Sequence, residues 1–199
     1  MSNDHYFTAK PGAPSEPIAL RVPMPEGTMQ LTTDRGVFSH GALDTGTRVL
    51  LLKAPAPPTA GNLLDLGCGT GPIAITLARR SPKATVWAVD INSRALRLTR
   101  DNARANGVTN IQTCTPEEID PAVRFDAIWS NPPIHIGKAA LHEMLLLWLP
   151  RLTPRGAALM VVQRHLGSDS LQTWLTAKGF PTERLNSAKG FRILRTTTP

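Results

Sequence analysis

Residues 62–72 read Asn-Leu-Leu-Asp-Leu-Gly-Cys-Gly-Thr-Gly-Pro, and this stretch decides the fold that we expect. The first part, 62–66, is a short and mainly apolar run that predicts a strand. Glycines then follow at alternate positions, where the missing side chain lets a ligand approach the backbone closely. Pro72 suits the first turn of a helix, because an N–H there would have no partner. The order strand, glycine-rich loop, helix is typical of a nucleotide-type site.

From this loop onward, short apolar runs alternate with amphipathic segments, which predicts an α/β domain with a largely parallel sheet. The chain ends differently, because two extended segments flank the turn Ser-Ala-Lys-Gly at 187–190 and should pair as an antiparallel hairpin. The expected strands are 62–66, 85–90, 111–114, 125–130, 157–162, 182–186 and 191–196, and the expected helices are 72–80, 93–106, 138–149 and 168–178.

The N-terminal region has a different character. Prolines recur through residues 1–28, which have few periodic apolar positions, so this segment is expected to be an extended arm. Residues 29–33 and 36–39 are expected to be two short extended pieces of a hairpin or meander. Asp44 should cap a helix that continues to Lys53, because its carboxylate can accept hydrogen bonds from the first turn. The main domain is therefore placed at residues 29–199.

Composition restricts the class of protein. The 199 residues fit one globular domain, and no apolar run is long enough to cross a bilayer. Residues 1–10 contain no apolar stretch of the kind found in signal peptides, so a cytoplasmic protein without membrane contact is expected. Two cysteines, and five histidines without ligand spacing, predict neither a disulfide framework nor a metal site.

The chain is basic, with 22 Lys and Arg against 15 Asp and Glu and a formal net charge of +7. Such an excess favours a polyanionic partner, which makes nucleic acid a candidate. Taken alone, the charge is explained equally well by an excess that only keeps the protein soluble.

The glycine-rich loop and the strand after it point to a cofactor that contains a ribose. Asp65 and the loop should border the crevice beyond the carboxyl ends of the parallel strands. Asp90 ends the strand 85–90, and its carboxylate could accept from both hydroxyls of a ribose. A dinucleotide is disfavoured, because Pro72 stands where the third glycine of Gly-x-Gly-x-x-Gly would fall. A helix cap is the structural alternative for Asp65, although it leaves the glycines unexplained.

Asn131-Pro132-Pro133 directly follows the strand 125–130. Proline has no N–H and pushes the residue before it to extended geometry, so this stretch offers rigid oxygen acceptors. The Asn131 side-chain oxygen and the Pro132 carbonyl could each accept one N–H of an amine and orient its lone pair for in-line displacement. Such acceptors also favour positive charge on the nitrogen, so no strong base is required. A proline-rich turn without a chemical role is the alternative.

The loop Asp-x-Gly-x-Gly-x-Gly at 65–71 resembles the first motif of class I S-adenosylmethionine-dependent methyltransferases. With Asn-Pro-Pro-Ile at 131–134, the chain is similar to the methyltransferase small domain family over nearly all residues after Met29. The resemblance implies a Rossmann-like sheet of seven mostly parallel strands with an antiparallel last strand and helices on both faces. It implies S-adenosylmethionine as the cofactor. The family includes guanine-N2 methyltransferases of small-subunit ribosomal RNA. The resemblance therefore also implies small-subunit ribosomal RNA as the substrate.

Two further segments carry the resemblance, Gly-Val-Phe-Ser-His-Gly-Ala-Leu-Asp-Thr-Gly-Thr at 36–47 and Lys-Gly-Phe-Arg-Ile-Leu-Arg at 189–195. The chain departs from the family pattern at Ile134, where many amine methyltransferases carry an aromatic residue that stacks on the target base. Stacking would then fall to Phe38 or His135, for which a core or a surface role is at least as good an explanation. The resemblance further implies that Phe38, Asp44, Gly46 and Thr47 line the cofactor or substrate pocket and that Thr115 or Glu117 lies near the adenine.

Larger relatives contain a second, degenerate methyltransferase half that helps to hold the substrate. It is not found in these 199 residues, so RNA binding should rest on the arm, on basic residues or on a homodimer. Lys138, Arg164 and Lys189 lie at the carboxyl edge of the expected sheet and are predicted to contact phosphates. A row of arginines on the helix 93–106 indicates a solvated face instead, and it consists of Arg94, Arg97, Arg100 and Arg104.

We therefore expect an S-adenosylmethionine-dependent N-methyltransferase that acts on guanine N2 of small-subunit ribosomal RNA. Two alternatives stay open: methylation of adenine N6 or of a protein glutamine, which also use Asn-Pro-Pro sites, and a non-catalytic RNA-binding or assembly factor with this fold. The predicted catalytic residues are Asn131, Pro132 and Pro133; the cofactor-binding residues are Asp65, Gly67, Cys68, Gly69, Gly71, Asp90, Ile91, Thr115 and Asn131; the substrate-binding residues are Phe38, Ile134, His135, Lys138, Arg164 and Lys189.

Overall fold

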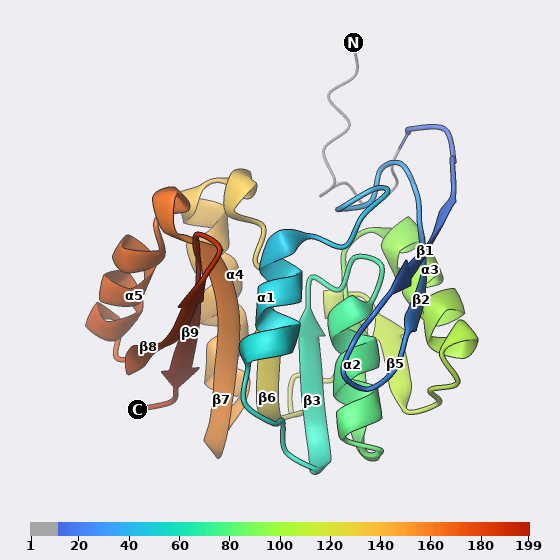
Figure 1. Ribbon diagram of the computed structural model, residues 1–199. Coiled ribbons are helices and arrows are strands. Elements are labelled where there is room, and N and C mark those ends of the chain that lie inside the picture. The colour runs from blue at the N-terminus through green and yellow to red at the C-terminus, as the bar shows by residue number, and fades with distance from the viewer. Residues whose placement is uncertain (1–11) are drawn as a thin grey trace.

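A computed structural model describes residues 12–199 of the chain. A seven-stranded sheet has the strand order β5-β4-β3-β6-β7-β9-β8, and a separate two-stranded sheet joins β1 to β2 (Figure 1). The predicted fold class, a Rossmann-like α/β sheet, is confirmed. The strands are β1 Ile18–Val22, β2 Met29–Thr33, β3 Ala60–Leu66, β4 Lys83–Val89, β5 Ile111–Cys114, β6 Phe125–Ser130, β7 Leu152–Gln163, β8 Thr182–Ala188 and β9 Phe191–Thr197.

Five α-helices lie within the described residues, and none of them is long and apolar enough to cross a bilayer. The helix that follows Asp44 and the helix that begins at Pro72 start where the sequence predicts. The remaining predicted elements agree with the structure apart from their end residues and the differences described below. The helices are α1 Thr45–Lys53, α2 Pro72–Arg80, α3 Ser93–Ala105, α4 Lys138–Trp148 and α5 Ser168–Ala177.

The central strands of the sheet are parallel. β3 pairs in parallel with β4 on one side and with β6 on the other. Its last four residues are buried, as expected for a strand that is covered on both faces and therefore reads as an apolar run. Because these strands share one direction, their carboxyl ends and the loops that follow them meet at one edge of the sheet. The glycine-rich loop and the Asn-Pro-Pro segment both lie at this edge.

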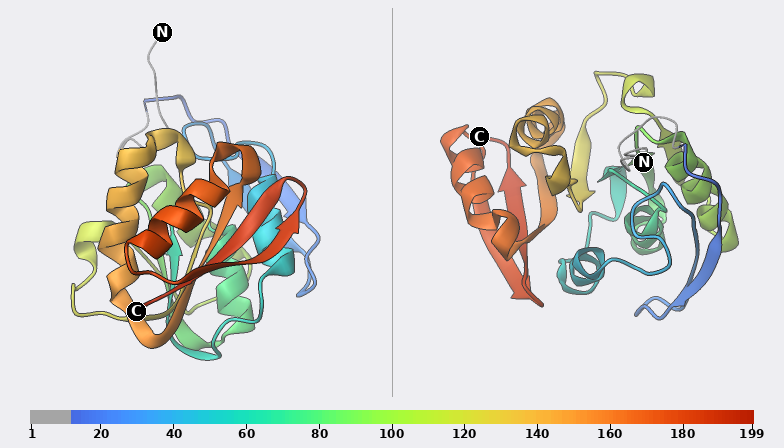
Figure 2. Two further views of the ribbon diagram at one scale, coloured as in Figure 1. Left: turned by 90° about the vertical axis from the view of Figure 1, so that its left-hand side faces the viewer. Right: turned by 90° about the horizontal axis from the view of Figure 1, so that it is seen from above.

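Helices cover both faces of the sheet (Figures 1 and 2). Successive residues of a strand point to opposite faces, and Leu63 and Leu64 of β3 accordingly belong to different hydrophobic clusters. The cluster around Leu63 contains buried side chains of α1, α2 and α3. The cluster around Leu64 contains those of α4 and α5. The sheet is thus held between two apolar cores, which fixes the edge that carries the site.

The predicted C-terminal hairpin is confirmed: β9 pairs antiparallel with both β7 and β8. The predicted four-residue turn was too long, because Ala188 already pairs with Phe191. Only Lys189 and Gly190 form the turn, with φ of 50° and 79°. Positive φ at both central residues defines a type I′ turn, whose twist matches that of the flanking strands, so pairing continues up to the turn.

The N-terminal hairpin is not the one that we expected. Residues 29–33 form β2 as predicted, but its antiparallel partner is β1, inside the segment expected to be an extended arm. Residues 36–39 form a turn and bends instead of a strand, with Gly36 at a φ of 73°. The sequence hides β1 because its five residues lie between Pro17 and Pro23. Residues 1–11 of the arm lie outside the described residues.

Asn102 of α3 and Asn106, the residue that caps the end of this helix, fasten the hairpin to the body of the molecule. The Asn102 side chain accepts from the Thr32 N–H at 2.7 Å and donates to the Thr32 carbonyl at 3.0 Å. Asn106 makes the same pair of bonds with Gln30, at 3.0 and 2.6 Å. Asn102 also donates to the Thr70 carbonyl at 2.9 Å, so one amide links the hairpin to the glycine-rich loop.

β7 begins at Leu152, five residues before the predicted start at residue 157. Gly156 lies against β6, where an added Cβ would be 2.7 Å from the Phe125 carbonyl oxygen. The register of the two strands shifts between Phe125 and Ala127. Gly156 is therefore a position of close backbone approach within a strand.

Candidate active site

The glycine-rich loop between β3 and α2 folds over the end of β4. The N–H groups of Gly67 and Cys68 both donate to the Val89 carbonyl oxygen, at 2.9 Å each. Gly67 and Gly69 have φ of 78° and 55°, in the left-handed region that a side chain disfavours. A Cβ on either glycine would meet nothing within 4 Å. This side of the loop therefore faces open space in which a ligand can contact the backbone.

The remaining loop positions face the protein. A Cβ on Gly71 would lie 2.8 Å from the Thr99 side chain, so this glycine allows the loop to pack closely on α3. The Thr99 hydroxyl donates to the Gly69 carbonyl at 3.0 Å and lies 3.5 Å from the Cys68 sulfur. Burial raises the pKa of the Cys68 thiol well above its usual value. Cys68 can therefore serve a ligand through its backbone, while its thiol belongs to the core.

Asp65 is fully buried beneath the loop at the end of β3. Its Oδ2 accepts from the Ala74 N–H at 2.9 Å and so caps the first turn of α2, which was the alternative role considered for this residue. Its Oδ1 has no hydrogen-bond partner among the described residues. Burial raises the pKa of Asp65 to about 8; the bond from Ala74 opposes this rise and the charge of Asp90 adds to it. The capping role therefore leaves one buried oxygen unsatisfied next to the loop.

Asp90 follows β4 and holds the loop from the neighbouring strand. Its Oδ2 accepts from the Gly69 N–H and its Oδ1 from the Asn92 N–H, at 2.9 Å each. Burial raises the pKa of Asp90, against the lowering effect of its backbone hydrogen bonds. Each carboxylate oxygen can accept more than one bond. Asp90 can therefore bind a ribose hydroxyl while it keeps the loop in place.

The ends of β4 and β5 form the next part of this edge, where the Asp90 N–H donates to the Cys114 carbonyl at 3.4 Å. Ile91 is 43% exposed there and offers an apolar surface. Thr115 caps the short helix Pro116–Glu118, and its N–H donates to the Glu118 carboxylate at 2.7 Å. Ile91 and Thr115 thus lie at the carboxyl ends of β4 and β5, and Glu117 is exposed in the first turn of the short helix.

The Asn131 amide is held in one orientation by α1. Its Nδ2 donates to Asp44 Oδ2 at 2.8 Å and to the Thr47 hydroxyl at 3.0 Å. The same Asp44 oxygen accepts from the Thr47 N–H at 2.7 Å, which caps the helix as predicted. Both amide hydrogens of Asn131 are therefore used, and its Oδ1 is left as an acceptor. This is the arrangement that an amine substrate requires.

The two prolines form a tighter turn than the sequence indicated. The Ile134 N–H donates to the Pro132 carbonyl at 2.8 Å around Pro133, whose φ and ψ of −74° and 78° are those of an inverse γ-turn. The Pro132 carbonyl oxygen therefore already accepts one backbone hydrogen bond, which leaves it a second lone pair. Pro132 itself is buried.

A single pocket joins the segments that were predicted separately. It is lined by the glycine-rich loop, by Asn131, by Asp44 and Thr47 of the α1 start, and by Phe38 from the N-terminal segment. Phe38 is 42% exposed, so its ring is accessible to a planar group. The structure therefore brings the predicted cofactor loop and the predicted acceptor residues to one place.

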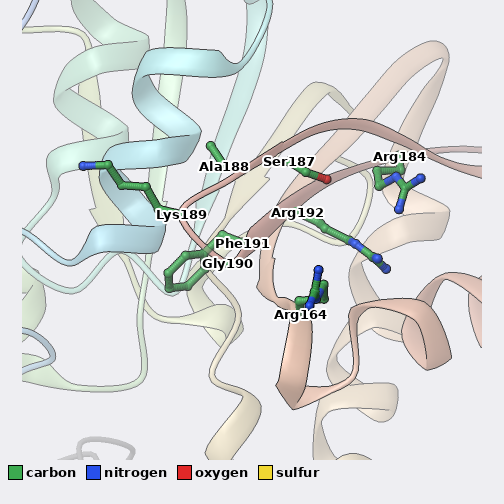
Figure 3. A pocket seen from close by; sticks show the side chains of 8 residues that line it. All are labelled: Arg164, Arg184, Ser187, Ala188, Lys189, Gly190, Phe191 and Arg192. Carbon is green, nitrogen blue, oxygen red and sulfur yellow. The ribbon is translucent and has the colours of Figure 1, made fainter.

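The other predicted substrate residues lie in different surroundings. Ile134 is partly buried and packs against the core cluster of α4 and α5. His135 and Lys138 are exposed after the Asn-Pro-Pro turn. Arg164 and Lys189 line a second cavity, at the β8–β9 hairpin, to which Lys138 does not contribute (Figure 3).

The sequence matches the model of a known family, described as the methyltransferase small domain, over residues 28–195. The chain belongs to the methyltransferase small domain family. The predicted resemblance is thereby confirmed, and with it the assignment to the methyltransferases.

Proteins similar to this small domain fall into two groups by length. An uncharacterized protein of Bacillus subtilis, YbxB, is 31% identical over 196 residues, which cover 97% of this chain and 98% of that protein. Ribosomal RNA small subunit methyltransferase C of Pseudomonas aeruginosa is 34% identical over 202 residues, which cover 91% of this chain and 56% of that enzyme. The Pseudomonas entomophila enzyme of the same name is 39% identical over 137 residues, 67% of this chain and 40% of that enzyme. The chain thus spans about half the length of these named enzymes.

Solved structures show the same fold. The 16S rRNA N2 G1207 methyltransferase of T. thermophilus, solved with AdoMet and guanosine, superimposes with a TM-score of 0.75 at 24% identity, over 95% of this chain and 52% of that one. The ribosomal protein L11 methylase of Lactobacillus delbrueckii gives a TM-score of 0.61 at 20% identity, over 77% and 76% of the two chains. At these identities the likeness establishes the fold of the small domain.

Sequence reasoning missed one contact that positions the site in this small domain. A Cβ added to Gly46 would lie 2.7 Å from the Phe191 ring. The C-terminal hairpin therefore packs directly on the start of α1. A signal was present, because glycine inside a helix is unfavourable and often marks a close approach. What the sequence did not indicate was the partner of that approach. Arg184 and Arg192, which line the hairpin cavity with Arg164, were also not identified.

Proposed function

We propose that this chain is an S-adenosylmethionine-dependent N-methyltransferase that methylates guanine N2 in small-subunit ribosomal RNA. The observation that supports this most strongly is the Asn131 amide, whose two hydrogens are bound by Asp44 and Thr47. Its oxygen is left to accept from an N–H donor, beside a glycine-rich loop that faces open space.

The residues present fit the cofactor. Gly67 and Gly69 leave room against the backbone, and the unpaired Oδ1 of Asp65 is a buried polar atom close to that loop. Asp90 would bind the ribose hydroxyls, and Ile91 and Thr115 would border the adenine. When bound, S-adenosylmethionine supplies an electrophilic methyl group on its sulfonium centre.

The protein's contribution to the reaction is to orient the amine and to stabilise charge. Asn131 Oδ1 and the free lone pair of the Pro132 carbonyl would each accept one N–H of the substrate NH₂, which directs the nitrogen lone pair toward the cofactor. Both acceptors become more favourable as the nitrogen gains positive charge in the transition state. The proton can leave to water after transfer, so the site needs no strong base.

Guanine in small-subunit ribosomal RNA is proposed from the relatives and from the charge. The similar Pseudomonas enzymes are named for small-subunit ribosomal RNA, and the T. thermophilus enzyme for guanine N2. A net charge of +7 suits a polyanionic substrate. This substrate would also place the protein in the cytoplasm, where ribosomes are assembled.

Adenine N6 and protein glutamine are the second candidate substrates. Like guanine N2, each of them offers an NH₂ group that Asn131 and Pro132 could hold. The small domain's likeness to a ribosomal protein methylase is of the fold only. A non-catalytic RNA-binding or assembly factor is the third candidate. It gives no reason for the fixed Asn131 amide, and failure to bind S-adenosylmethionine in calorimetry would favour it.

Transfer of labelled methyl groups tests the proposal. The protein is incubated with labelled S-adenosylmethionine and, separately, naked ribosomal RNA, assembled small subunits and total protein, and nucleosides are then analysed by mass spectrometry. Label in N2-methylguanosine is the expected result. Label only in adenosine or protein would support the second candidate, and no label with any substrate would overturn the methyltransferase proposal.

A homodimer stays a prediction. With one methyltransferase domain in these residues, a second copy would enlarge the RNA-binding surface. Light scattering of the purified protein, with and without RNA, checks this prediction, and a monomer under both conditions would contradict it.

A further inference from the structure

A second cavity, the hairpin cavity, lies apart from the candidate active site. It has a volume of about 390 Å³ and lies between the β8–β9 hairpin and the end of β7. Figure 3 shows Arg164, Arg184 and Arg192 on one side of the hairpin, with Lys189 at the turn extending away from them toward α1. We call the cavity bounded by these three arginines the arginine groove.

The groove has more positive charge than its neighbours neutralise. Arg192 pairs with Asp169 at the start of α5 and donates to the Ser168 hydroxyl at 3.3 Å, and its side chain is only 12% exposed. The side chains of Arg164, Arg184 and Lys189 make no ion pair with any carboxylate within residues 12–199. Arg164 and Arg184 are exposed. A cluster of exposed cations without counter-charges produces a local positive potential that attracts anions, so the groove is suited to an anionic ligand.

The groove is built from backbone that is held in place. The Arg164 N–H donates to the Gly190 carbonyl at 2.8 Å, which fixes the end of β7 against the hairpin turn. The type I′ turn at Lys189 and Gly190 and the pairing of Ser187 with Arg192 set the positions of the strands. The arginines therefore project from rigid elements, as a preorganised site requires.

The arginine groove adjoins the candidate active site through the hairpin itself. Phe191, beside the turn, packs on Gly46 of α1. The same helix start carries Asp44 and Thr47, which hold the Asn131 amide. One hairpin thus borders the groove on one side and packs on the helix start that holds Asn131 on the other.

We propose that the arginine groove binds a backbone phosphate of the RNA strand next to the nucleotide that is methylated. This inference rests on the proposed function and adds to it the place where the strand is held. An amine in a base-paired guanine cannot reach a recessed acceptor, so the nucleotide must leave the stack, and its flanking phosphates are then held at the rim of the site. Guanidinium groups suit this role because their planar N–H donors match phosphate oxygens in pairs.

Salt-dependent binding measures the number of phosphate contacts directly. The full chain and the variant Arg164→Gln/Arg184→Gln are titrated with a fluorescein-labelled fragment of small-subunit ribosomal RNA at several salt concentrations. Each lost phosphate contact should lower the slope of log Kd against log salt by roughly 0.7 to 0.9. Because the groove is proposed to hold one phosphate, we expect a loss of slope corresponding to one contact and roughly tenfold weaker binding at low salt.

The matched control is Arg97→Gln/Arg155→Gln, which removes the same charge from exposed positions on α3 and at the start of β7. Its slope should stay at the wild-type value. A second variant, Arg164→Lys/Arg184→Lys, should keep most of the slope but lose affinity, because lysine retains the charge without the paired donors. Equal slopes for the wild type and the Arg164→Gln/Arg184→Gln variant, or equal losses in that variant and the control, would overturn the proposal.

Two readouts separate this proposal from the proposed function. Methyl transfer to RNA by the wild type tests the function, and the binding slope tests the groove without any turnover. If the wild type transfers methyl groups but the slope is unchanged by the glutamine variant, only the groove proposal fails. Thermal unfolding and S-adenosylmethionine calorimetry on each variant verify that the fold and the cofactor site are intact.

Discussion

Asn131 is an acceptor only because of what surrounds it. A free side-chain amide can turn either its oxygen or its nitrogen toward a substrate, and only the oxygen suits an amine. Asp44 and Thr47 accept both amide hydrogens, at 2.8 and 3.0 Å, and thereby select one orientation. At the scale of residues, the orientation of the Asn131 amide thus depends on the carboxylate of Asp44, the residue that caps the start of α1.

A double-mutant cycle tests this dependence. We expect Asn131→Ala to lower kcat by about 10²- to 10³-fold, while the affinity for S-adenosylmethionine changes little, because the interaction belongs to the transition state. Asp44→Ala alone should lower kcat by about tenfold through misorientation of the amide and cost about 1 kcal/mol of stability through loss of the helix cap. In the Asn131→Ala background the same change should scarcely affect kcat, since coupled residues are not additive.

Steady-state kinetics and calorimetry measure these effects, and Gln112→Ala on the exposed side of β5 is a control that should behave as the wild type. Fully additive losses in the cycle would show that Asp44 acts independently of Asn131. Unchanged turnover in Asn131→Ala would remove the mechanism.

Asp65 should make stability depend on pH. Its folded-state pKa of about 8 lies above the ordinary value of 3.8, so between these values the folded state binds the proton that the unfolded state has lost. Its contribution to the free energy of unfolding is therefore complete below about pH 4 and declines as the pH rises through 8. The isosteric variant Asp65→Asn carries no such proton.

Urea unfolding from pH 4 to pH 9 measures the difference between the two proteins. We expect the variant to gain stability relative to the wild type as the pH rises, by up to a few kcal/mol, on the order of 1.4 kcal/mol per unit of pKa shift at most. Parallel pH profiles for the two proteins would contradict the raised pKa of Asp65.

At the scale of elements, the contact between α1 and the C-terminal hairpin holds the two sides of the site together. α1 presents the residues that orient Asn131, and the hairpin carries the arginine groove. Their contact depends on the absence of a side chain at Gly46, against which the Phe191 ring packs. A helix position that costs intrinsic stability is thus occupied by glycine because of its tertiary neighbour.

Gly46→Ala should separate the hairpin from α1. The added Cβ would lie 2.7 and 2.9 Å from two atoms of the Phe191 ring, so the ring must move. We expect a loss of about 1 to 3 kcal/mol in stability, typical of overpacking, and lower turnover on RNA. Adding Phe191→Leu should restore part of the stability by making space. Chemical denaturation measures both variants, and a more stable Gly46→Ala protein would show that helix propensity outweighs the contact.

At the scale of the whole molecule, the sheet lies between two apolar cores, and the residues of the candidate active site lie at one edge of it. Asn102 links the N-terminal hairpin to the glycine-rich loop, because its side chain donates to the carbonyl oxygens of both Thr32 and Thr70. Phe38 follows this hairpin and reaches the pocket. The molecule as a whole carries a net charge of +7. This charge should act mainly by attracting an anionic substrate during association, and less through any single contact.

Salt should therefore affect the RNA step and not the cofactor step. We expect kcat/KM for RNA to fall steeply, by about tenfold or more between roughly 50 and 200 mM salt, because several phosphate contacts release counterions. The Kd for S-adenosylmethionine, which has no net excess of negative charge, should change by less than about twofold. Initial rates and calorimetry over this range measure both quantities. A flat salt profile for the methyl acceptor would favour a protein glutamine as the substrate.

Much of the fold and of the cofactor site could be predicted from local patterns in the sequence. β5, β6 and α2 have the expected bounds, since apolar runs and a proline at a helix start are local signals. The glycine-rich loop and Asn-Pro-Pro could be placed at one edge because all parallel strands end there. Asp44 was recognised as a helix cap, which a single carboxylate before a helix indicates.

Only the tertiary structure decided how these parts meet. The bonds from Asn131 to Asp44 and Thr47 join residues 87 and 84 positions apart, and no local pattern encodes such a distance. The partner of Gly46, the pairing of β1 with β2 and the convergence of Arg164 with Arg184 depend in the same way on strand order and packing. The sequence alone indicated the glycine-rich loop, Asp90 and Asn-Pro-Pro as candidate site segments, because residue type and local backbone preference are properties of short segments. The structure decided which of them act together, because that follows from the burial of two apolar cores by the entire chain.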